Sequence, residues 1–230
     1  MVQLGPVMEL HTFSIVARDR AAGEFGVAVA TARPNVGSLV PFVSLAGAIA
    51  TQARVNTDLG RHGLALLERG VPVDVALRCL VEADPERDIR QVHGLDAERG
   101  FCHTGGGCVP WCGHRAGPDF TVAGNMLAGP GVVEAMAEAF AASEEPDLAG
   151  RILRSLEAGQ AAGGDKRGKQ SAALLVASRR PRPYHNLRVD DHADPVAELR
   201  RIYEVVAAHA RQLEREYGAE GSRLFGKVKL

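Results

Sequence analysis

Strand-like and helix-like hydrophobic patterns alternate in groups along this chain, and that order limits the fold more than any single motif does. Segments rich in β-formers lie at 12–17, 25–31, 39–44, 46–52, 89–95, 100–104, 172–176 and 187–190. Helical periodicity lies at 58–69, 73–81, 132–140, 148–156 and 195–213. The strands fall into antiparallel pairs with helices between them. This order predicts an α+β fold in which two mainly antiparallel sheets lie between two helical layers.

One domain accounts for most of the chain. No segment has the composition of an interdomain linker and no internal repeat is visible, so we expect a single domain over residues 12–217. Its last helix has a defined start, because Asp194 can act as the N-cap and Pro195 suits the first helical position. Residues 1–11 are an N-terminal extension to the domain. Residues 218–230 contain Gly and Lys and are expected to form a loosely held tail.

Charge and hydropathy exclude several classes of partner. The formal net charge is −1, so the chain has no field that would attract nucleic acid or an anionic membrane. No apolar run approaches the ~20 residues that span a bilayer, and the N-terminus lacks the pattern of a secretion signal. We therefore expect a cytoplasmic protein with a small-molecule substrate or ligand, no nucleic acid and no membrane. In that compartment its four cysteines would be reduced thiols.

A polar loop, Gly-Gly-Asp-Lys-Arg-Gly-Lys-Gln-Ser at 163–171, runs directly into the apolar strand at 172–176. It is a near match to a phosphate-binding loop. Such a loop, however, follows a strand and opens a helix, because the helix N-terminus holds the phosphates. Here a helix precedes and a strand follows, so we exclude nucleotide binding. A polar loop before a buried strand is still a typical place for chemistry, and Asp165, Arg167 and Ser171 are its candidates. The alternative is a solvated turn.

A group of possible metal ligands lies nearby in the sequence: Cys102, His103, Cys108, Cys112 and His114. Their spacing lacks the Cys-x2-Cys unit of structural zinc sites. We therefore favour small buried thiols over zinc or iron–sulfur binding, and expect no metal and no cofactor. His114 is a separate candidate, either as an acid or base or as a structural histidine.

Amide and guanidinium side chains supply further candidates for binding. Gln52 and Asn56 flank the end of the strand at 46–52, and their amides suit an oxyanion or a substrate carbonyl. Ordinary turn and N-cap bonding is the alternative for both. Arg33 or Arg167 could hold a substrate carboxylate through two parallel N–H bonds, and a surface role is the alternative for each.

Several longer motifs carry a resemblance to a known family. They are Thr12-Phe-Ser-Ile-Val-Ala-Arg-Asp19, Val36-Gly-Ser-Leu-Val-Pro41, Ala50-Thr-Gln-Ala53, Gly113-His114, Gly124-Asn125, the loop 163–171 and Arg188-Val-Asp-Asp-His-Ala-Asp-Pro195. Together they resemble the bacterial family called domain of unknown function 1028, which is placed in the N-terminal-nucleophile (Ntn) hydrolase superfamily. The resemblance runs from about Thr12 to about Ile202. It implies a four-layer αββα sandwich, in agreement with the order of strands and helices, and it supplies no substrate.

The resemblance also implies a reaction. In that superfamily a Thr, Ser or Cys becomes the first residue of the mature chain, and its own α-amine acts as general base. The amine suits this role because its pKa is about 7.7–8. Thr12 would thus be a latent nucleophile, freed by a cut after His11, that hydrolyses an amide or peptide-like C–N bond. The alternative is that Thr12 is only a residue with good β propensity.

Supporting roles follow from the same resemblance. Asp165 and Ser171 would orient the terminal amine of Thr12, and donors would hold the oxyanion. The candidates for substrate binding are Ser14, Arg33, Gln52, Asn56, His114, Asn125 and Arg167. Ser14 is included because it follows Thr12 on the same face of the strand. This fold often assembles through its outer helices, so we also expect a homo-oligomer.

Two other functions remain open at this point. The chain could be a catalytically silent member of the fold that binds a small molecule or serves as an oligomeric scaffold. Alternatively, the uncut chain could hydrolyse its substrate through another group, such as Ser14 or a water assisted by His114. The enzyme with a free Thr12 amine is the leading hypothesis, and maturation at Thr12 separates it from the others.

Overall fold

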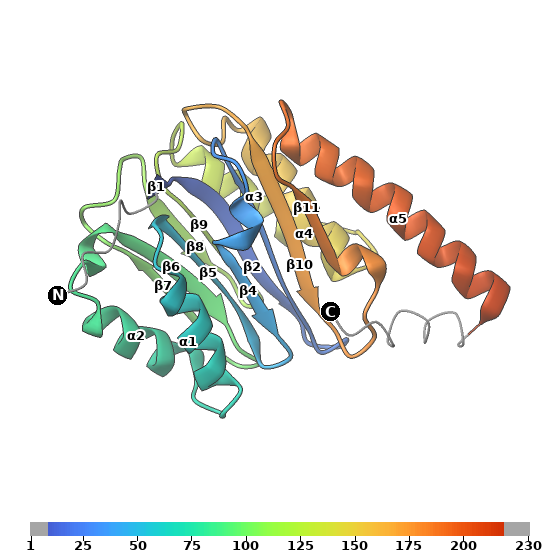
Figure 1. Cartoon of the computed structure of the whole chain (residues 1–230), viewed down its shortest axis with the longest axis horizontal. Coiled ribbons are helices and arrows are strands. Elements are labelled where there is room, and N and C mark those ends of the chain that lie inside the picture. Colours follow the sequence, from blue (N-terminus) through green and yellow to red (C-terminus); the bar gives the residue numbers. More distant parts are fainter. Residues whose placement is uncertain (1–8, 219–230) are drawn as a thin grey trace.

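A computed structural model of the 230-residue chain describes residues 9–218, which form two antiparallel sheets and five α-helices (Figure 1). The five-stranded sheet has the order β1 (Glu9–Leu10), β5 (Gly47–Arg54), β6 (Arg90–Leu95) and β7 (Gly100–Thr104), with β4 (Pro41–Ser44) also paired to β5. The six-stranded sheet has the order β11 (Asn186–Val189), β10 (Ser171–Ala177), β3 (Glu24–Thr31), β2 (Thr12–Asp19), β9 (Phe120–Gly124) and β8 (Gly113–Ala116). The α-helices are α1 (Thr57–Leu67), α2 (Val73–Ala83), α3 (Gly131–Ala141), α4 (Leu148–Ala161) and α5 (Pro195–Tyr217), and the short 3-10 helices are η1 (Val36–Ser38), η2 (Arg87–Ile89) and η3 (Pro183–His185).

Buried apolar side chains separate these elements into layers. One cluster lies between the two sheets and includes Val16 and Val29 from one sheet and Ala50 from the other. A second cluster packs the six-stranded sheet against α3, α4 and α5. A third packs the five-stranded sheet against α1 and α2. Figure 1 shows α1 and α2 on one side of the molecule and α5 on the other. The α+β prediction is therefore confirmed as two antiparallel sheets with five helices.

Strand β2 shows how the sequence builds these layers. Successive side chains of a strand point to opposite faces of the sheet. Phe13 and Ile15 accordingly join the apolar cluster beneath the helices. Val16 joins the cluster between the sheets. Thr12 and Ser14 share the face of Val16, so this strand directs two hydroxyl groups into the space between the sheets.

Most expected strands and helices are present, but the hydrophobic pattern misses β1, β8 and β9. Strand β9 is a buried run of five residues that pairs with both β2 and β8. Its alternation is short, and the surrounding segment from Gly113 to Gly131 is rich in glycine and proline, so no strand stands out there. The consequence is that the sequence gives no hint of which strand covers the free edge of β2.

The start of α5 differs from expectation in one detail. Asp194 precedes Pro195 as predicted, but only its backbone carbonyl serves the helix, by accepting the N–H of Glu198. Its carboxylate instead accepts a hydrogen bond from Lys169 Nζ at 3.1 Å. This ion pair links the polar loop at 163–171 to the start of α5.

Both predicted terminal segments lie largely outside the described residues. Of the extension at 1–11, residues 9 and 10 form β1, and residues 1–8 lie outside the described part. Of the tail, Gly218 is described and residues 219–230 are not. Between residues 9 and 218, the helices are all too short or too polar to cross a membrane.

Candidate active site

Six polar side chains are buried together between the two sheets, and we call them the polar cluster: Thr12, Ser14, Gln52, Gln91, His93 and Asn125. All six residues are 0% exposed. They come from β2, β5 and β6 and from the residue that follows β9. Burying such groups costs free energy unless they are hydrogen-bonded. Each of the six has a hydrogen-bond partner within the cluster.

The hydroxyl groups of β2 meet the amide of Gln52. Thr12 Oγ1 donates to Gln52 Oε1 at 2.5 Å, and Ser14 Oγ donates to the same oxygen at 2.8 Å. The Nε2 of Gln52 points the other way and donates to Gln91 Oε1 at 2.8 Å. Gln52 therefore presents its carbonyl oxygen to Thr12, not the N–H groups that an oxyanion would need. It holds the Thr12 hydroxyl in place, and the expected oxyanion role does not fit this orientation.

Gln91 is the central member of the cluster. Its Nε2 donates to the backbone carbonyls of Gly124 (2.9 Å) and Gly113 (3.1 Å), and these groups can only accept. The orientation of the Gln91 amide is thereby fixed, with Oε1 facing the rest of the cluster. That oxygen accepts hydrogen bonds from Gln52 Nε2 and from Asn125 Nδ2, the latter at 2.9 Å. One amide thus sets the orientation of two others.

His93 forms a second branch of the cluster. Its Nε2 lies 2.7 Å from Ser14 Oγ, and its Nδ1 lies 2.9 Å from Thr121 Oγ1. Burial, and next the charge of His114, lowers the pKa of His93 from 6.5 to about 3. The ring is therefore neutral at neutral pH. Because Ser14 Oγ gives its single proton to Gln52 Oε1, Nε2 of the neutral ring donates to Ser14 Oγ. The ring could act as a base for Ser14 only in its other tautomer.

Backbone strain accompanies the cluster. Ala53 and Met126 have φ angles of 71° and 54°, in the left-handed region that residues other than glycine seldom adopt. Ala53 directly follows Gln52, and Met126 directly follows Asn125. Such strain costs about 1–3 kcal/mol per residue and is often found where side chains must be aimed at a site.

The peptide bond between His11 and Thr12 lies at the edge of the cluster, and its carbonyl is held by two donors. Thr31 Oγ1 donates to the carbonyl oxygen of His11 at 2.6 Å, and Arg167 Nη2 donates to it at 3.0 Å. The register explains the first contact, because Thr31 of β3 lies directly opposite Thr12 of β2. A guanidinium and a hydroxyl on one carbonyl oxygen draw electrons from it and favour negative charge there.

The loop at 163–171 supplies this arginine. Asp165 is 2% exposed and accepts two side-chain bonds from Arg167, from Nε at 3.0 Å and from Nη2 at 2.6 Å. Asp165 also accepts the N–H of Ala32 at 3.2 Å. Gly163 and Gly164, with φ of 113° and 52°, allow the chain to make this turn. In this structure Asp165 thus holds the guanidinium of Arg167 beside the His11 carbonyl.

Ser171 lies at the far end of the same loop and is directed away from Thr12. Its Oγ donates to the carbonyl of Arg33 at 2.5 Å and accepts the N–H of Val36 at 3.1 Å. These bonds tie the start of β10 to the segment that follows β3. No hydrogen bond in the described part of the chain joins Ser171 or Asp165 to Thr12, and their expected contact with its amine stays a prediction for a cut chain.

The imidazole of His11 fills a buried position beside Asn125. His11 is 3% exposed, and its Nδ1 lies 2.7 Å from Asn125 Oδ1. The residue before it, Leu10, belongs to β1 and pairs with Ala53 of β5. The chain therefore enters the site as an edge strand on β5 and leaves it as β2 of the other sheet.

Three expected site residues lie away from Thr12. Asn56 caps α1 by accepting the N–H of Asp58 and also donates to Asp84. Arg33 is exposed, and its backbone carbonyl accepts the hydrogen bond from Ser171 Oγ. His114 is on the exposed strand β8, and its Nδ1 lies 2.8 Å from Thr104 Oγ1.

His114 is nevertheless connected to the polar cluster. Thr104 Oγ1 accepts a hydrogen bond from Gln91 Nε2 at 2.9 Å, so the hydroxyl links the central amide to the imidazole. Partial burial, and next the charge of His103, lowers the pKa of His114. His114 is joined to the cluster through Thr104. From Thr104 the path to Thr12 passes through two more side chains, Gln91 and Gln52.

The cysteines form no metal centre among the described residues. No three His, Cys, Asp or Glu side chains gather there in a way that could hold an ion. Burial raises the pKa of Cys102 to about 12 and that of Cys108 to about 11, which is typical of inert buried thiols. The sulfur of Cys108 bonds to the backbone carbonyl of Arg90, so it has a packing role.

Four residues of the site have no counterpart among the sequence candidates: Thr31, Gln91, His93 and Thr121. All four are buried. Thr31, Gln91 and His93 lie on strands that the hydrophobic pattern predicted, and Thr121 lies on β9, which the pattern missed. The signal that could have revealed them is a polar residue at every second position of a buried strand. Gln91 and His93 show it in β6, where period two places both on one face.

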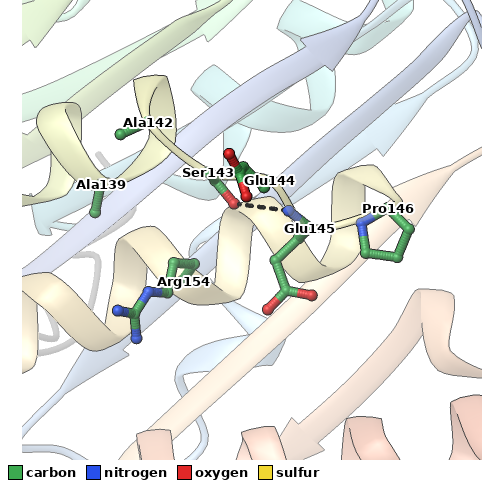
Figure 2. A pocket seen from close by; sticks show the side chains of 7 residues that line it. All are labelled: Ala139, Ala142, Ser143, Glu144, Glu145, Pro146 and Arg154. Atoms are coloured by element: carbon green, nitrogen blue, oxygen red, sulfur yellow. Dashed lines mark hydrogen bonds between the residues drawn. The ribbon is translucent and has the colours of Figure 1, made fainter.

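A hollow lies elsewhere on the molecule, between the end of α3 and α4. It has a volume of about 510 Å³, and Figure 2 shows the side chains that line it: Ala139, Ala142, Ser143, Glu144, Glu145, Pro146 and Arg154. Ser143 Oγ accepts the N–H of Glu145 at 3.4 Å. None of the predicted site residues lines this hollow, and it contains no cluster of catalytic side chains.

Comparison with known proteins identifies the family. The family described as "Family of unknown function (DUF1028)" matches residues 12–199, so the chain belongs to this family, as the motifs predicted. The chain is also similar to protein SPO2555 from Silicibacter pomeroyi, whose crystal structure is assigned to the same family. The two are 34% identical with a TM-score of 0.78, over 84% of this chain and 85% of that one. No curated protein matches the chain.

Proposed function

We propose that this member of the DUF1028 family is an Ntn-type amidohydrolase that cleaves a small amide or a peptide-like C–N bond, with Thr12 as its latent nucleophile. The two stacked sheets with outer helices are the arrangement that the superfamily would require. Thr12 opens a central strand of the six-stranded sheet, and its hydroxyl is held in position by Gln52. No cofactor is needed for this chemistry, because the nucleophile, base and oxyanion donors are all protein groups.

The observation that carries the proposal is the contact made by the His11 carbonyl. Thr31 Oγ1 and Arg167 Nη2 both donate to this oxygen, at 2.6 Å and 3.0 Å. Negative charge would develop on the same oxygen if the peptide bond before Thr12 were attacked. Donors that are fixed in advance at such an oxygen typically lower the barrier by about 3–4 kcal/mol. They support cleavage at the bond that must break to free Thr12.

The maturation step would proceed through an ester. Thr12 Oγ1 adds to the carbonyl carbon of His11, the C–N bond between the two residues breaks, and the nitrogen takes up a proton as the hydroxyl loses its own. Water then hydrolyses the ester, which releases the His11 carboxylate and restores the Thr12 hydroxyl. The new α-amine of Thr12 would serve as the base in later turnovers.

Turnover of an added amide would repeat this chemistry. The α-amine accepts the proton of Oγ1, Oγ1 attacks the acyl carbon, and the leaving amine departs with a proton. Arg167 and Thr31 are available for the acyl oxygen once the His11 carbonyl has left. Asp165 acts as a positioning residue, because it holds the guanidinium of Arg167 by two bonds.

The test is amide hydrolysis by the full-length protein after prolonged incubation near pH 8. Release of amine or ammonia from a panel of small amides and short peptides would be measured for wild type, Thr12→Ala and Thr12→Ser. Ser14→Ala is measured beside them, since it removes the other hydroxyl that donates to Gln52 Oε1 and tests the alternative nucleophile. We expect Thr12→Ala to lose about 1000-fold in rate and Thr12→Ser to retain most of it. Full activity of Thr12→Ala would rule the proposal out.

One observation favours a second candidate, a catalytically silent binder or scaffold. In the uncut chain Thr12 and Ser14 both donate to an amide oxygen, which is a very weak base, and Thr12 is 0% exposed. A protein that stays uncut would keep its nucleophile in this inactive arrangement. Such a protein would bind small molecules without turning them over.

Catalysis without a cut would require a different pair, and Ser14 with His93 is the pair in contact, at 2.7 Å. The panel distinguishes this third case directly. Loss of activity in Ser14→Ala and His93→Gln, with Thr12→Ala unaffected, would assign the nucleophile to Ser14. Loss in Thr12→Ala alone would assign it to Thr12.

A further inference from the structure

The side chain of His11 occupies a pocket that the polar cluster has shaped for a hydrogen-bond donor. Its Nδ1 lies 2.7 Å from Asn125 Oδ1, and both residues are buried. Because an amide oxygen only accepts, the imidazole must place a proton on Nδ1 at this contact. The contact therefore requires a ring whose Nδ1–H is directed at Asn125 Oδ1.

The chemistry of this pocket follows from the fixed orientation of the amides behind it. Gln91 Nε2 donates to two backbone carbonyls, so Gln91 Oε1 must face Asn125. Asn125 Nδ2 donates to that oxygen at 2.9 Å, which leaves Asn125 Oδ1 directed at His11. Reversing the Asn125 amide would bring two acceptors, Asn125 Oδ1 and Gln91 Oε1, face to face. The pocket thus presents an acceptor to whatever fills it.

We propose that this pocket is the acyl-side specificity subsite of Thr12, and that it selects an uncharged side chain that donates a hydrogen bond. The inference rests on the proposed function, since it assigns to the substrate the place that His11 holds before the cut. The substrate class is then an amide whose acyl part carries a donor such as an imidazole or a carboxamide. An acyl part with a carboxylate side chain is excluded, because it would bury an anion against the oxygen of Asn125.

The backbone on the acyl side extends this subsite. Leu10 pairs with Ala53 and Glu9 pairs with Arg54, in antiparallel register at the edge of β5. A peptide that adds to a sheet edge gains main-chain hydrogen bonds, while pockets for its side chains give the specificity. The preferred acyl group is accordingly an extended peptide of two or more residues, not a single small acid.

The protein's own bond is the first substrate for testing the subsite. Cleavage after residue 11 would be followed by intact mass in full-length wild type and in His11→Asn, His11→Asp and His11→Ala. Asn keeps a donor at the position of Nδ1, and Asp has the same shape but brings an anionic acceptor. We expect His11→Asn to stay within about threefold of wild type, His11→Ala to slow by about 10-fold and His11→Asp by about 100-fold or more. His62→Ala, which removes an exposed histidine from α1, is the control and should cleave at the wild-type rate.

A second measurement keeps the test independent of any folding defect in the variants. Matured wild-type protein would be given two coumarin amides, N-acetyl-Leu-His and N-acetyl-Leu-Asp, and the release of aminocoumarin would be compared. We expect kcat/KM for the His amide to exceed that for the Asp amide by at least about 10-fold. Asn125→Leu, which removes the acceptor that faces His11, should reduce this preference.

The outcomes separate the two proposals. Cleavage at equal rates in all His11 variants, with no preference between the two coumarin amides, would overturn the subsite and leave the amidohydrolase standing. Absence of any cleavage, in wild type as in the variants, would overturn both. The predicted order of rates in both assays would establish the subsite.

Discussion

The space between the two sheets has two ends of opposite character. At one end Val16, Val29, Ala50 and Leu95 pack into an apolar core. At the other end the same strands bury the six residues of the polar cluster. Thr12, Ser14 and Val16 lie on one face of β2. The change from polar to apolar side chains therefore occurs between two successive positions of that face, Ser14 and Val16. The side chains named at both ends are 0–1% exposed.

This difference indicates that buried polar side chains are not required for the two sheets to pack against each other. The apolar end shows that small aliphatic side chains can fill this space between the same strands. A satisfied buried hydrogen bond adds only about 0.5–1.5 kcal/mol of net stability, whereas a buried polar group without a partner costs about 1–3 kcal/mol. The polar end is therefore vulnerable to disruption and gains little stability in return, which agrees with the proposed catalytic function.

The largest effect is expected for Gln91→Leu. The substitution removes the amide that holds Gln52, Asn125 and the carbonyl of Gly124, and leaves several buried polar groups unsatisfied. We expect a loss of about 3–5 kcal/mol in the free energy of unfolding, measured by urea denaturation. A loss below 1 kcal/mol would mean that the cluster is not a connected unit.

Leu95→Ala gives the corresponding value for the apolar end. Leu95 is 1% exposed and lies on β6, two positions beyond His93 on the same face. We expect a loss of about 2–4 kcal/mol from cavity formation, without any change in pH dependence. An unchanged urea midpoint would contradict the assignment of Leu95 to the core between the sheets.

Acid should destabilise the polar end through His93. The pKa of its ring is about 3 in the folded state and 6.5 as the reference value for the unfolded chain. The unfolded state therefore takes up the proton first, and stability falls as the pH drops from 6.5 toward 3. One such histidine lowers the free energy of unfolding by about 2 kcal/mol between pH 7.5 and pH 5.

Comparison with His93→Gln isolates this contribution. His185, whose pKa burial lowers to about 4, titrates in the same direction but is present in both proteins. The difference between the two pH profiles of unfolding free energy should therefore report His93 alone. Parallel profiles would show that His93 does not carry the acid sensitivity.

The smallest effect is expected for Thr12→Val. Valine keeps the shape of threonine and its β propensity, and Ser14 still donates to Gln52 Oε1. We expect a change in the free energy of unfolding within about 1 kcal/mol, because a bond is lost while an apolar group is gained. A loss near 3 kcal/mol would assign Thr12 a structural role and weaken the case for a nucleophile.

The sequence predicted the paired strands and helices because their hydrophobic periods are long enough to recognise. It missed β9, whose five residues are set among glycines and prolines. Within the candidate site, the sequence named Thr12, Gln52 and Arg167 as candidates, since each stands near a strand end or in a polar loop. The direction of the Gln52 amide could not be predicted, because it depends on Gln91 from a neighbouring strand.

The two donors to the His11 carbonyl come from different parts of the chain, one from a strand and one from the polar loop. Thr31 lies 20 residues from His11 along the chain, and Arg167 lies 156 residues from it. Only the pairing of β2 with β3 and the turn of the polar loop bring both to one carbonyl oxygen. Asp165 lies in the polar loop, and its contact with Arg167 depends on a turn that two glycines make possible.

The most direct test of the account is the intact mass and N-terminal sequence of the purified full-length protein, followed over time near pH 8. Wild type, Thr12→Ala and Arg167→Met would be compared. We expect wild type to yield a chain beginning at Thr12, Thr12→Ala to stay uncut, and Arg167→Met to be cut at least about 10-fold more slowly. A wild-type chain that keeps its full-length mass would contradict the proposed nucleophile and leave the binder as the better explanation.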